Sequence, residues 1–187
     1  MKKLLFVLLV LFFFMGNVNA QEGKMHIGAG VEIGLPIGDW SDFAGTGIGG
    51  SARFEYAFTK QIVGMLTAGY ISFGGKEIES FSFSYSAIPF LPGVKYYFKN
   101  GLYGMAELGL HFFSVDVEVP AQTFNGFTFG GSSGSSSSTE FTLSLGGGYE
   151  TPISDNLILD ANVKFAIISD ANYFGVRVGL KIALDKL

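Results

Sequence analysis

Hydrophobic and polar residues alternate along most of the chain after Lys24, and a period of two is the signature of β-strands. The last clear stretch, "VRVGLKIAL" (176–184), places a sizeable aliphatic residue at every second position. Arg177, Lys181 and two small residues lie between them. Such a strand has one oily face and one face that carries charge and small side chains.

The same pattern predicts eight strands in all. They are 25–36, 48–58, 62–73, 87–98, 102–113, 141–150, 157–167 and a last strand from 173. The strand at 62–73 is apolar on both faces, so its orientation stays open. In "FSFSYSAIPF" (81–90) the apolar positions slip by one residue, which predicts a β-bulge near Ser86 and Ala87. Pro89 cannot donate to a ladder and fits an interruption there.

The connections between these strands alternate in length. Those at 59–60, 99–101 and 151–156 are short, whereas 38–47, 74–86 and 114–140 are longer, with 169–172 as an exception. Short turns at one end and long loops at the other are typical of outer-membrane barrels. Strands of about ten residues also match the length needed to cross a bilayer at a tilt near 45°.

The polar face of each strand decides what surrounds the barrel. It carries only one or two charges per strand, with glycine, alanine and serine between them. This is too few for a face in water, but small residues fit the narrow interior of an eight-stranded barrel. We therefore expect an all-β, eight-stranded antiparallel up-and-down transmembrane β-barrel with aliphatic residues toward lipid. Aromatic residues near the short turns predict an interfacial girdle (Tyr56, Phe58, Tyr96, Phe98, Tyr149).

Composition agrees with this interpretation. Charged residues make up 15% of the 187 residues and 27 are glycine, while a typical soluble domain has roughly 25% charged residues. The formal net charge of −4 argues against nucleic acid as a partner. The chain has no cysteine, which excludes disulfides and thiolate metal sites.

The first twenty residues predict a secretory signal peptide. Lys2 and Lys3 precede the apolar run 4–15, and Val18 and Ala20 are the small residues of a cleavage site. The run is short of the ~20 residues that a spanning helix needs. We expect residues 1–20 to be removed and 21–187 to form the barrel domain.

The segments "PFLPGVKYYF" (89–98) and "GVRVGLKIAL" (175–184), the signal peptide and the eight alternating segments resemble the small eight-stranded bacterial outer-membrane β-barrel family. The resemblance covers about residue 24 to the end. It implies location in the bacterial outer membrane, insertion by the barrel-assembly machinery, and outer-membrane lipid and lipopolysaccharide as partners. A monomer is expected.

By the parity of the strands, one set of ionisable residues faces the lumen. The predicted charge network comprises Glu32, Arg53, Glu55, Lys95, Glu107, Asp160, Lys164, Arg177 and Lys181, with His26 and His111 nearby. Because an unpaired buried charge costs several kcal/mol, we interpret the set as ion pairs that plug the lumen. A proton or ion path is the alternative. If the barrel closes, the cations of the last strand should lie beside Glu32.

Enzyme signals are poor, and no catalytic, cofactor-binding or metal site is predicted. "GTGIGG" (45–50) fits G-x-G-x-x-G but leads into a strand, so we interpret it as the flexible end of a loop. Asp39 and Asp42 in the first loop could act as an acid–base pair, although solvated loop carboxylates are far more common.

The longest loop is the candidate surface-contact region. Asn125-Gly126 predicts a hairpin that presents Phe124, Phe127 and Phe129, and "GGSSGSSSS" (130–138) reads as a flexible linker or disordered segment. These aromatic residues could contact another surface, or they could simply fold onto the rim.

The sequence thus predicts a non-enzymatic barrel with a structural or cell-surface interaction role and no large pore. A narrow porin-like channel for small hydrophobic molecules is the second hypothesis, an outer-membrane enzyme is the third, and a soluble exported barrel of lipocalin type is a further alternative.

Overall fold

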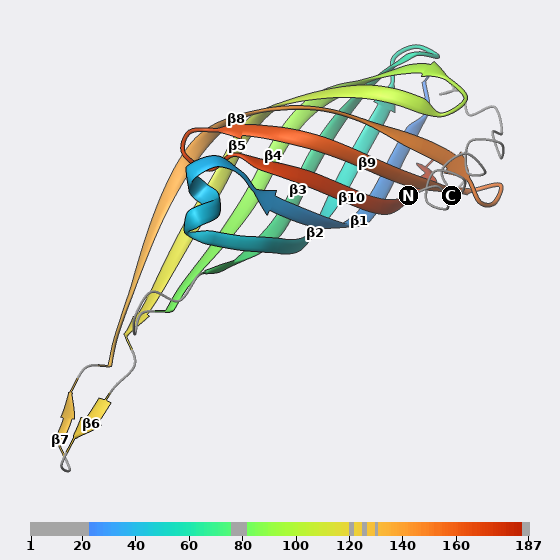
Figure 1. The fold of residues 1–187 in the computed structure, drawn as a ribbon. Helices are drawn as coiled ribbons and strands as arrows, with labels where there is room; N and C mark the ends of the chain where they lie inside the picture. The colour runs from blue at the N-terminus through green and yellow to red at the C-terminus, as the bar shows by residue number, and fades with distance from the viewer. Residues whose placement is uncertain (1–22, 76–81, 120–121, 125–126, 130, 185–187) are drawn as a thin grey trace, which may run out of the picture.

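The computed structural model describes residues 23–75, 82–119, 122–124, 127–129 and 131–184. The predicted signal peptide lies outside these residues. Eight long strands form a closed barrel in the order β1-β10-β9-β8-β5-β4-β3-β2, and every neighbouring pair is antiparallel (Figure 1). The predicted fold class is confirmed. No helix in the described part of the chain is long and apolar enough to span a membrane.

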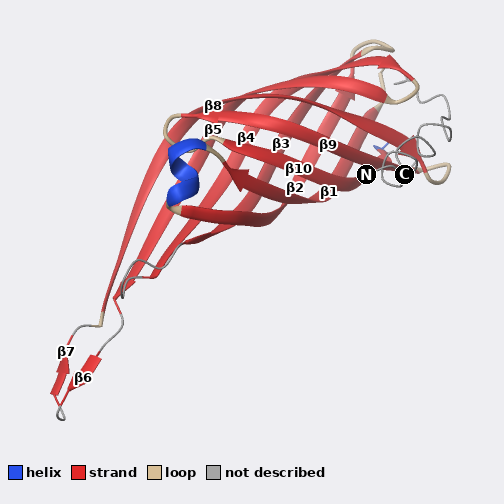
Figure 2. Cartoon of the chain, in the orientation of Figure 1, coloured by secondary structure: helices blue, strands red, loops and turns tan. Residues whose placement is uncertain are grey.

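The strands of the barrel are close to the predicted ones at the short-turn end and longer at the other. Their bounds are β1 Met25–Pro36, β2 Ala44–Ala57, β3 Ile62–Gly75, β4 Ser82–Lys99, β5 Leu102–Val119, β8 Ser132–Pro152, β9 Leu157–Ile168 and β10 Tyr173–Ala183. The short strands β6 Gln122–Phe124 and β7 Phe127–Phe129 pair with each other beyond the barrel, and the 3₁₀ helix η1 spans Gly38–Asp42. Figure 2 shows that strands make up almost the entire described chain.

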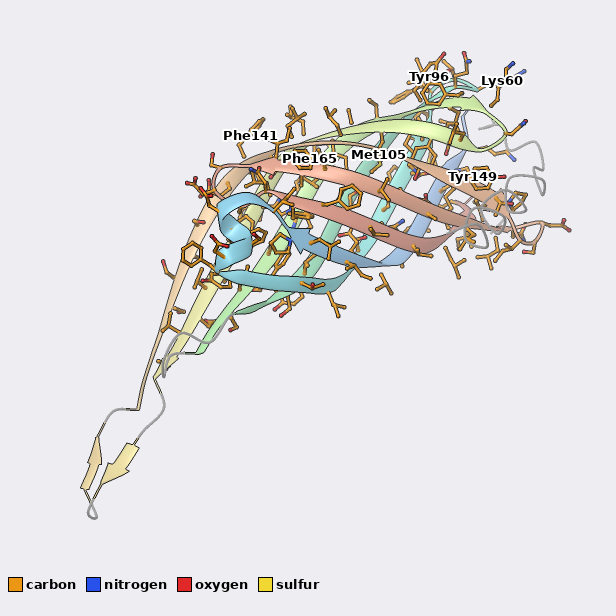
Figure 3. The ribbon with its side chains drawn as sticks, in the orientation of Figure 1. Lys60, Tyr96, Met105, Phe141, Tyr149 and Phe165 are labelled. Carbon is orange, nitrogen blue, oxygen red and sulfur yellow. The ribbon has the colours of Figure 1, made fainter. Side chains whose placement is uncertain are left out.

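Alternation places the oily face outside on every strand. Large apolar side chains cover the outer wall, among them Val31 (59% exposed), Phe141 (61%) and Val178 (50%), and Figure 3 shows side chains such as Phe141 and Phe165 on the barrel wall. The orientation of β3 is now defined, since Val63, Met65 and Thr67 are buried inside. Closing the barrel pairs every strand on both sides, which an open sheet in lipid could not achieve.

The short turns carry the expected features of that end of the barrel. Asn100 (φ 53°) and Gly101 (φ 81°) both have positive φ, as the two-residue turn between β4 and β5 requires. Aromatic rings stand beside these turns in pairs: half-buried Tyr56 with exposed Phe58, and exposed Tyr96 with exposed Phe98, at centroid distances of 5.1 and 5.4 Å. β1 begins and β10 ends at this end of the barrel (Figure 1).

The predicted β-bulge at Ser86 and Ala87 is wrong. The β4–β5 register runs without a shift from Ser82↔Glu118 to Tyr97↔Tyr103, and its one irregularity falls between Tyr97 and Lys99. The apolar residues change sides instead, because Tyr85 points inward and packs against a buried cluster near the long-loop end. An interruption does occur at Pro89, because β3 and β4 are paired at Ala68↔Phe90 and next at Ile71↔Ala87.

Two predicted loops are strand. The "GTGIGG" segment (45–50) lies within β2, and the connection before it is shortened by η1, so its interpretation as a flexible loop end is wrong. Ser132–Ser138 of the glycine-serine tract lies within β8 and pairs with β5 from Val119↔Ser132 onward. β5 supplies a full partner strand for this tract, and that ladder compensates for the weak β-propensity of serine and glycine.

Candidate functional site

The interior of the barrel is charged over most of its length. All nine residues of the predicted network are at least 94% buried, and they come from six different strands. They are Glu32 on β1, Arg53 and Glu55 on β2, Lys95 on β4, Glu107 on β5, Asp160 and Lys164 on β9, and Arg177 and Lys181 on β10. Strand closure also places Arg177 opposite Glu32 in the β1–β10 register, as expected.

The network is densest near the short turns, where two lysines sit among carboxylates. The Lys95 ammonium lies 2.5 Å from Glu55, 2.7 Å from Glu150 and 3.3 Å from Asp160. Lys181 bridges Glu55 (2.7 Å) and Glu150 (2.6 Å). These contacts join five strands, β2, β4, β8, β9 and β10, across the lumen.

Asp160 connects this end to the middle of the barrel. Its carboxylate accepts hydrogen bonds from Arg53 (3.0 Å) and Arg177 (3.2 Å), and from the hydroxyl of Tyr103 (2.5 Å). Gly148 makes room for that hydroxyl, because a Cβ there would lie 2.5 Å from it. The Asp160 carboxylate thus contacts three cations, since Lys95 also lies against it, and the hydrogen bond from Tyr103 holds it in position.

A third group lies nearer the long loops. Lys164 stands between Glu32 (3.4 Å) and Glu107 (3.3 Å). The hydroxyl of Thr67 donates to Glu107 (2.8 Å) and accepts from the Nε of Arg53 (3.1 Å). Arg53 contacts both Asp160 in the middle of the barrel and Glu107 nearer the long loops, and Lys95 links Asp160 to the group near the short turns. The three groups therefore form one continuous polar network.

The prediction omitted one member, Glu150. This residue is fully buried and contacts Lys95, Lys181 and the hydroxyl of Tyr97 (2.7 Å). With it, the network holds five cations and five carboxylates, so its formal charge is balanced. The parity of the strand already placed Glu150 inward with Thr142 and Ser144, but it was the last residue of that predicted strand.

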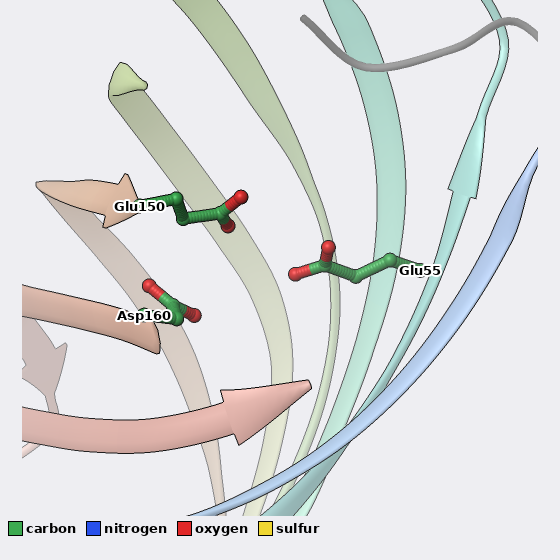
Figure 4. A group of neighbouring side chains, drawn as sticks. All are labelled: Glu55, Glu150 and Asp160. Atoms are coloured by element: carbon green, nitrogen blue, oxygen red, sulfur yellow. The ribbon is translucent and has the colours of Figure 1, made fainter. Parts of the chain in front are cut away.

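Glu55, Glu150 and Asp160 come together closely enough to suggest a metal site. Their carboxylate oxygens lie within 4.8 Å of one another, and Figure 4 shows the three groups converging from different strands. The Lys95 ammonium, however, already contacts an oxygen of each of them. The cation of this cluster is therefore a lysine, and the arrangement is an ion-pair plug.

Aromatic side chains close the lumen at the long-loop end. Trp40 on η1 is 8% exposed and packs edge-on against Phe73 (4.7 Å) and Phe113 (5.9 Å), with Tyr173 at 6.5 Å. Gly34 permits this packing, because a Cβ there would lie 2.8 Å from the Phe73 ring. We call Trp40, Phe73, Phe113 and Tyr173 the aromatic cap.

The two histidines have different places. His111 is buried between the cap and the network, where its ring nitrogens contact the hydroxyls of Thr142 (2.7 Å) and Tyr173 (3.0 Å). His26 is half-buried near the start of β1, at the short-turn end. The structure does not bring them together.

The candidate surface loop is an extension of the barrel wall. β5 and β8 continue beyond β9, and β4 accompanies β5 as far as Ser82↔Glu118. The two strands lead to the β6–β7 hairpin, where Phe124 pairs with Phe127 and Gln122 with Phe129 (Figure 1). Asn125 and Gly126, predicted as its turn, lie outside the described residues.

The outer surface changes character where this extension begins. On β5 the outward residues Leu108, Leu110 and Phe112 are apolar and exposed, and they are followed by Ser114 and Asp116. On neighbouring strands Ile88 gives way to Ser86, and Phe141 to Thr139. The apolar band ends at Ile88↔Phe112 on β4 and β5 and one pair earlier, at Leu110↔Phe141, on β8. Such an end on three adjacent strands is expected at the edge of the hydrocarbon region.

A closed, antiparallel barrel with an apolar wall and a paired polar interior defines the class: a transmembrane β-barrel. The profile of the outer membrane protein beta-barrel domain family matches residues 5–182, and the chain belongs to that family. This confirms the resemblance.

Solved structures with the same fold cover most of the chain. The attachment invasion locus protein Ail of Yersinia pestis aligns with 88% of this chain and 100% of its own at 14% identity and a TM-score of 0.64. Neisserial surface protein A (NspA) covers 86% and 99% at 14% identity (TM-score 0.56), and OprG of Pseudomonas aeruginosa covers 89% and 98% at 13% identity (TM-score 0.56). No curated protein matches the sequence. At these identities the similarity shows the fold alone.

Proposed function

We propose that this outer-membrane barrel is a non-conducting, non-enzymatic protein whose function is interaction at the cell surface. The observation that carries the proposal is the filled lumen: ten buried ionisable groups are cross-linked along the interior, and the aromatic cap covers them. A solute would have to break several buried ion pairs to pass, which costs several kcal/mol for each partner left alone.

The same contacts support a non-enzymatic role. Glu55, Glu107 and Asp160 each contact at least two cations, so none of them is free to accept a proton from a substrate. We therefore expect the functional contacts on the outside of the barrel. The extended β5–β8 wall is the largest feature that projects from it (Figure 1).

Conductance measurements in planar lipid bilayers test this proposal. The full mature chain should give no stable conductance step, with a general porin as the positive control in the same bilayer. The variant Trp40→Gly should also be silent, because the ion-pair network lies below the cap and remains intact. Regular porin-sized steps from the unmodified chain would overturn the proposal.

A narrow channel that passes small hydrophobic molecules into the membrane is the second candidate. The observation in its favour is the gap in the β3–β4 pairing beside Pro89, with buried Ile71 and Ala87 adjacent to it. Faster entry of a fluorescent fatty acid into liposomes carrying the barrel, abolished by a disulfide that joins β3 to β4 across this gap, would favour it.

A further inference from the structure

The outer edge of β8 is an unpaired sheet edge. β8 pairs with β5 from Ser132 to Tyr149, but its pairing with β9 begins only at Thr142. Among the described residues, segment 133–141 therefore has a neighbouring strand on one side only, and Figure 1 shows it running along the outside of the projecting wall. At about 3.4 Å per residue, this free edge is roughly 30 Å long.

This edge lacks the usual protection against strand addition. Natural sheets block exposed edges with lysine, proline, bulges or covering loops. Segment 133–141 reads "SGSSSSTEF", contains neither lysine nor proline, and is exposed from Ser133 to Thr139. Its register with β5 is regular throughout, so no bulge twists the edge away. The backbone is thus available for main-chain hydrogen bonds to an added strand.

The negative charge of Asp116, beside the free edge of β8, favours a positively charged partner strand. Asp116 on β5 is exposed on the outward face and lies opposite Ser135 in the register, and the hollow around it is lined by serines of β4 and β8. A strand added to β8 would lie about 4.8 Å beyond it, with only the small Ser135 side chain between the new strand and Asp116. A lysine or arginine has a stem long enough to cross a serine and reach the carboxylate.

The charged residues described at this end of the barrel have the same sign. Asp39, Asp42 and Asp170 are exposed near the loops, and segments 37–47, 82–90, 110–119, 131–142 and 165–175 contain no lysine or arginine. A second copy of this chain would bring a second acidic surface to the edge, whereas a cationic partner would be attracted to it.

We infer that the β8 edge at 133–141 binds an extended cationic polypeptide segment by strand addition, with basic side chains at alternate positions on its outward face. This inference rests on the proposed surface-interaction function and names the class of partner. Main-chain hydrogen bonds supply the attachment, and the cation that reaches Asp116 supplies the preference.

Peptide binding to the full chain in lipid nanodiscs tests it. The probe is a nine-residue peptide that alternates lysine with threonine. It should bind, whereas the same peptide with glutamate for lysine, or with every backbone amide N-methylated, should not. Asp116→Asn should weaken binding about three- to fivefold, the size expected of one exposed ion pair. The matched control Asp39→Asn, an exposed acid on η1, should bind like the unmodified chain.

Hydrogen exchange locates the site. The peptide should slow exchange of backbone amides within 133–141 and leave β9, which is already paired on both sides, unchanged. Equal binding of the N-methylated peptide, protection elsewhere but not in 133–141, or a stable dimer of this chain with a protected edge would each overturn the inference. Such results would leave the absence of conductance untouched, so failure of the inference is distinguishable from failure of the proposed function.

Discussion

Individual side chains in the lumen are held by more than one opposite charge, and this makes the network sensitive to single substitutions. Lys95 is fully buried, contacts three carboxylates and lies 4.3 Å from the centre of the Tyr103 ring. When one partner of a buried ion pair is removed, the other remains as an uncompensated buried charge.

Lys95→Gln should therefore lower the free energy of unfolding by about 3–5 kcal/mol. Urea titrations in lipid vesicles, followed by the fluorescence of Trp40, the single tryptophan of the chain, would measure the change. Lys60→Gln is the matched control, because Lys60 is exposed in the β2–β3 turn, and it should change stability by less than about 0.5 kcal/mol.

The double variant Lys95→Gln/Glu150→Gln should recover part of the loss, because it restores equal numbers of cations and carboxylates. Equal stability of Lys95→Gln and the unmodified chain would mean that the lumen charges are hydrated and do not form a plug.

The aromatic cap gives a second prediction at the level of single residues. Trp40 is shielded by Phe73 and Phe113, so iodide should quench its fluorescence weakly in the folded barrel. Phe73→Ala should raise the Stern–Volmer constant severalfold by opening a path to the indole. Phe98→Ala, which removes an exposed ring at the opposite end, should leave quenching unchanged. Strong quenching of the unmodified protein would show that the cap is open in solution.

At the level of strands, the alternation of residue types predicted which segments are strands and which side chains face inward. That information is local, because neighbouring side chains in a strand point to opposite faces. The lengths of β4, β5 and β8 were not predictable in this way. Serine and glycine have no alternation of hydrophobic character, and Ser132–Ser138 is a strand because β5 lies beside it.

The change of sides in 81–90 was misinterpreted for a related reason. The pattern was read as though one environment surrounded the whole strand, so a slip in parity implied a bulge. In the structure the outward face of β4 changes from apolar to polar between Ile88 and Ser86, and beyond that point the sheltered face for Tyr85 is the inner one. The contacts within the charge network also needed the structure, since they join residues as far apart in sequence as Glu32 and Lys164.

The projecting part of β5 and β8 should be dispensable for folding. None of the described residues of 115–136 belongs to the ion-pair network or to the aromatic cap. Replacing 115–136 by Asn-Gly, a favoured two-residue hairpin turn, should leave a barrel that still shows the heat-dependent shift of gel mobility. A variant that migrates as unfolded protein without heating would show that the projecting strands are needed to close the barrel.

On the scale of the whole molecule, all functional conclusions depend on where lipid ends and water begins. The barrel has an apolar band on the outside, a neutral, cross-linked interior, and a polar wall that continues past the band on one side (Figure 3). If the band is in lipid, the edge of β8 stands in the aqueous phase outside the membrane.

Spin labels placed singly along the outward face of β5 measure this most directly. Labels at Leu108, Leu110 and Phe112 should be accessible to dissolved oxygen and protected from an aqueous nickel reagent, and labels at Ser114 and Asp116 should show the reverse. Nickel accessibility at Leu108 and Leu110 equal to that at Asp116 would contradict a lipid-facing wall.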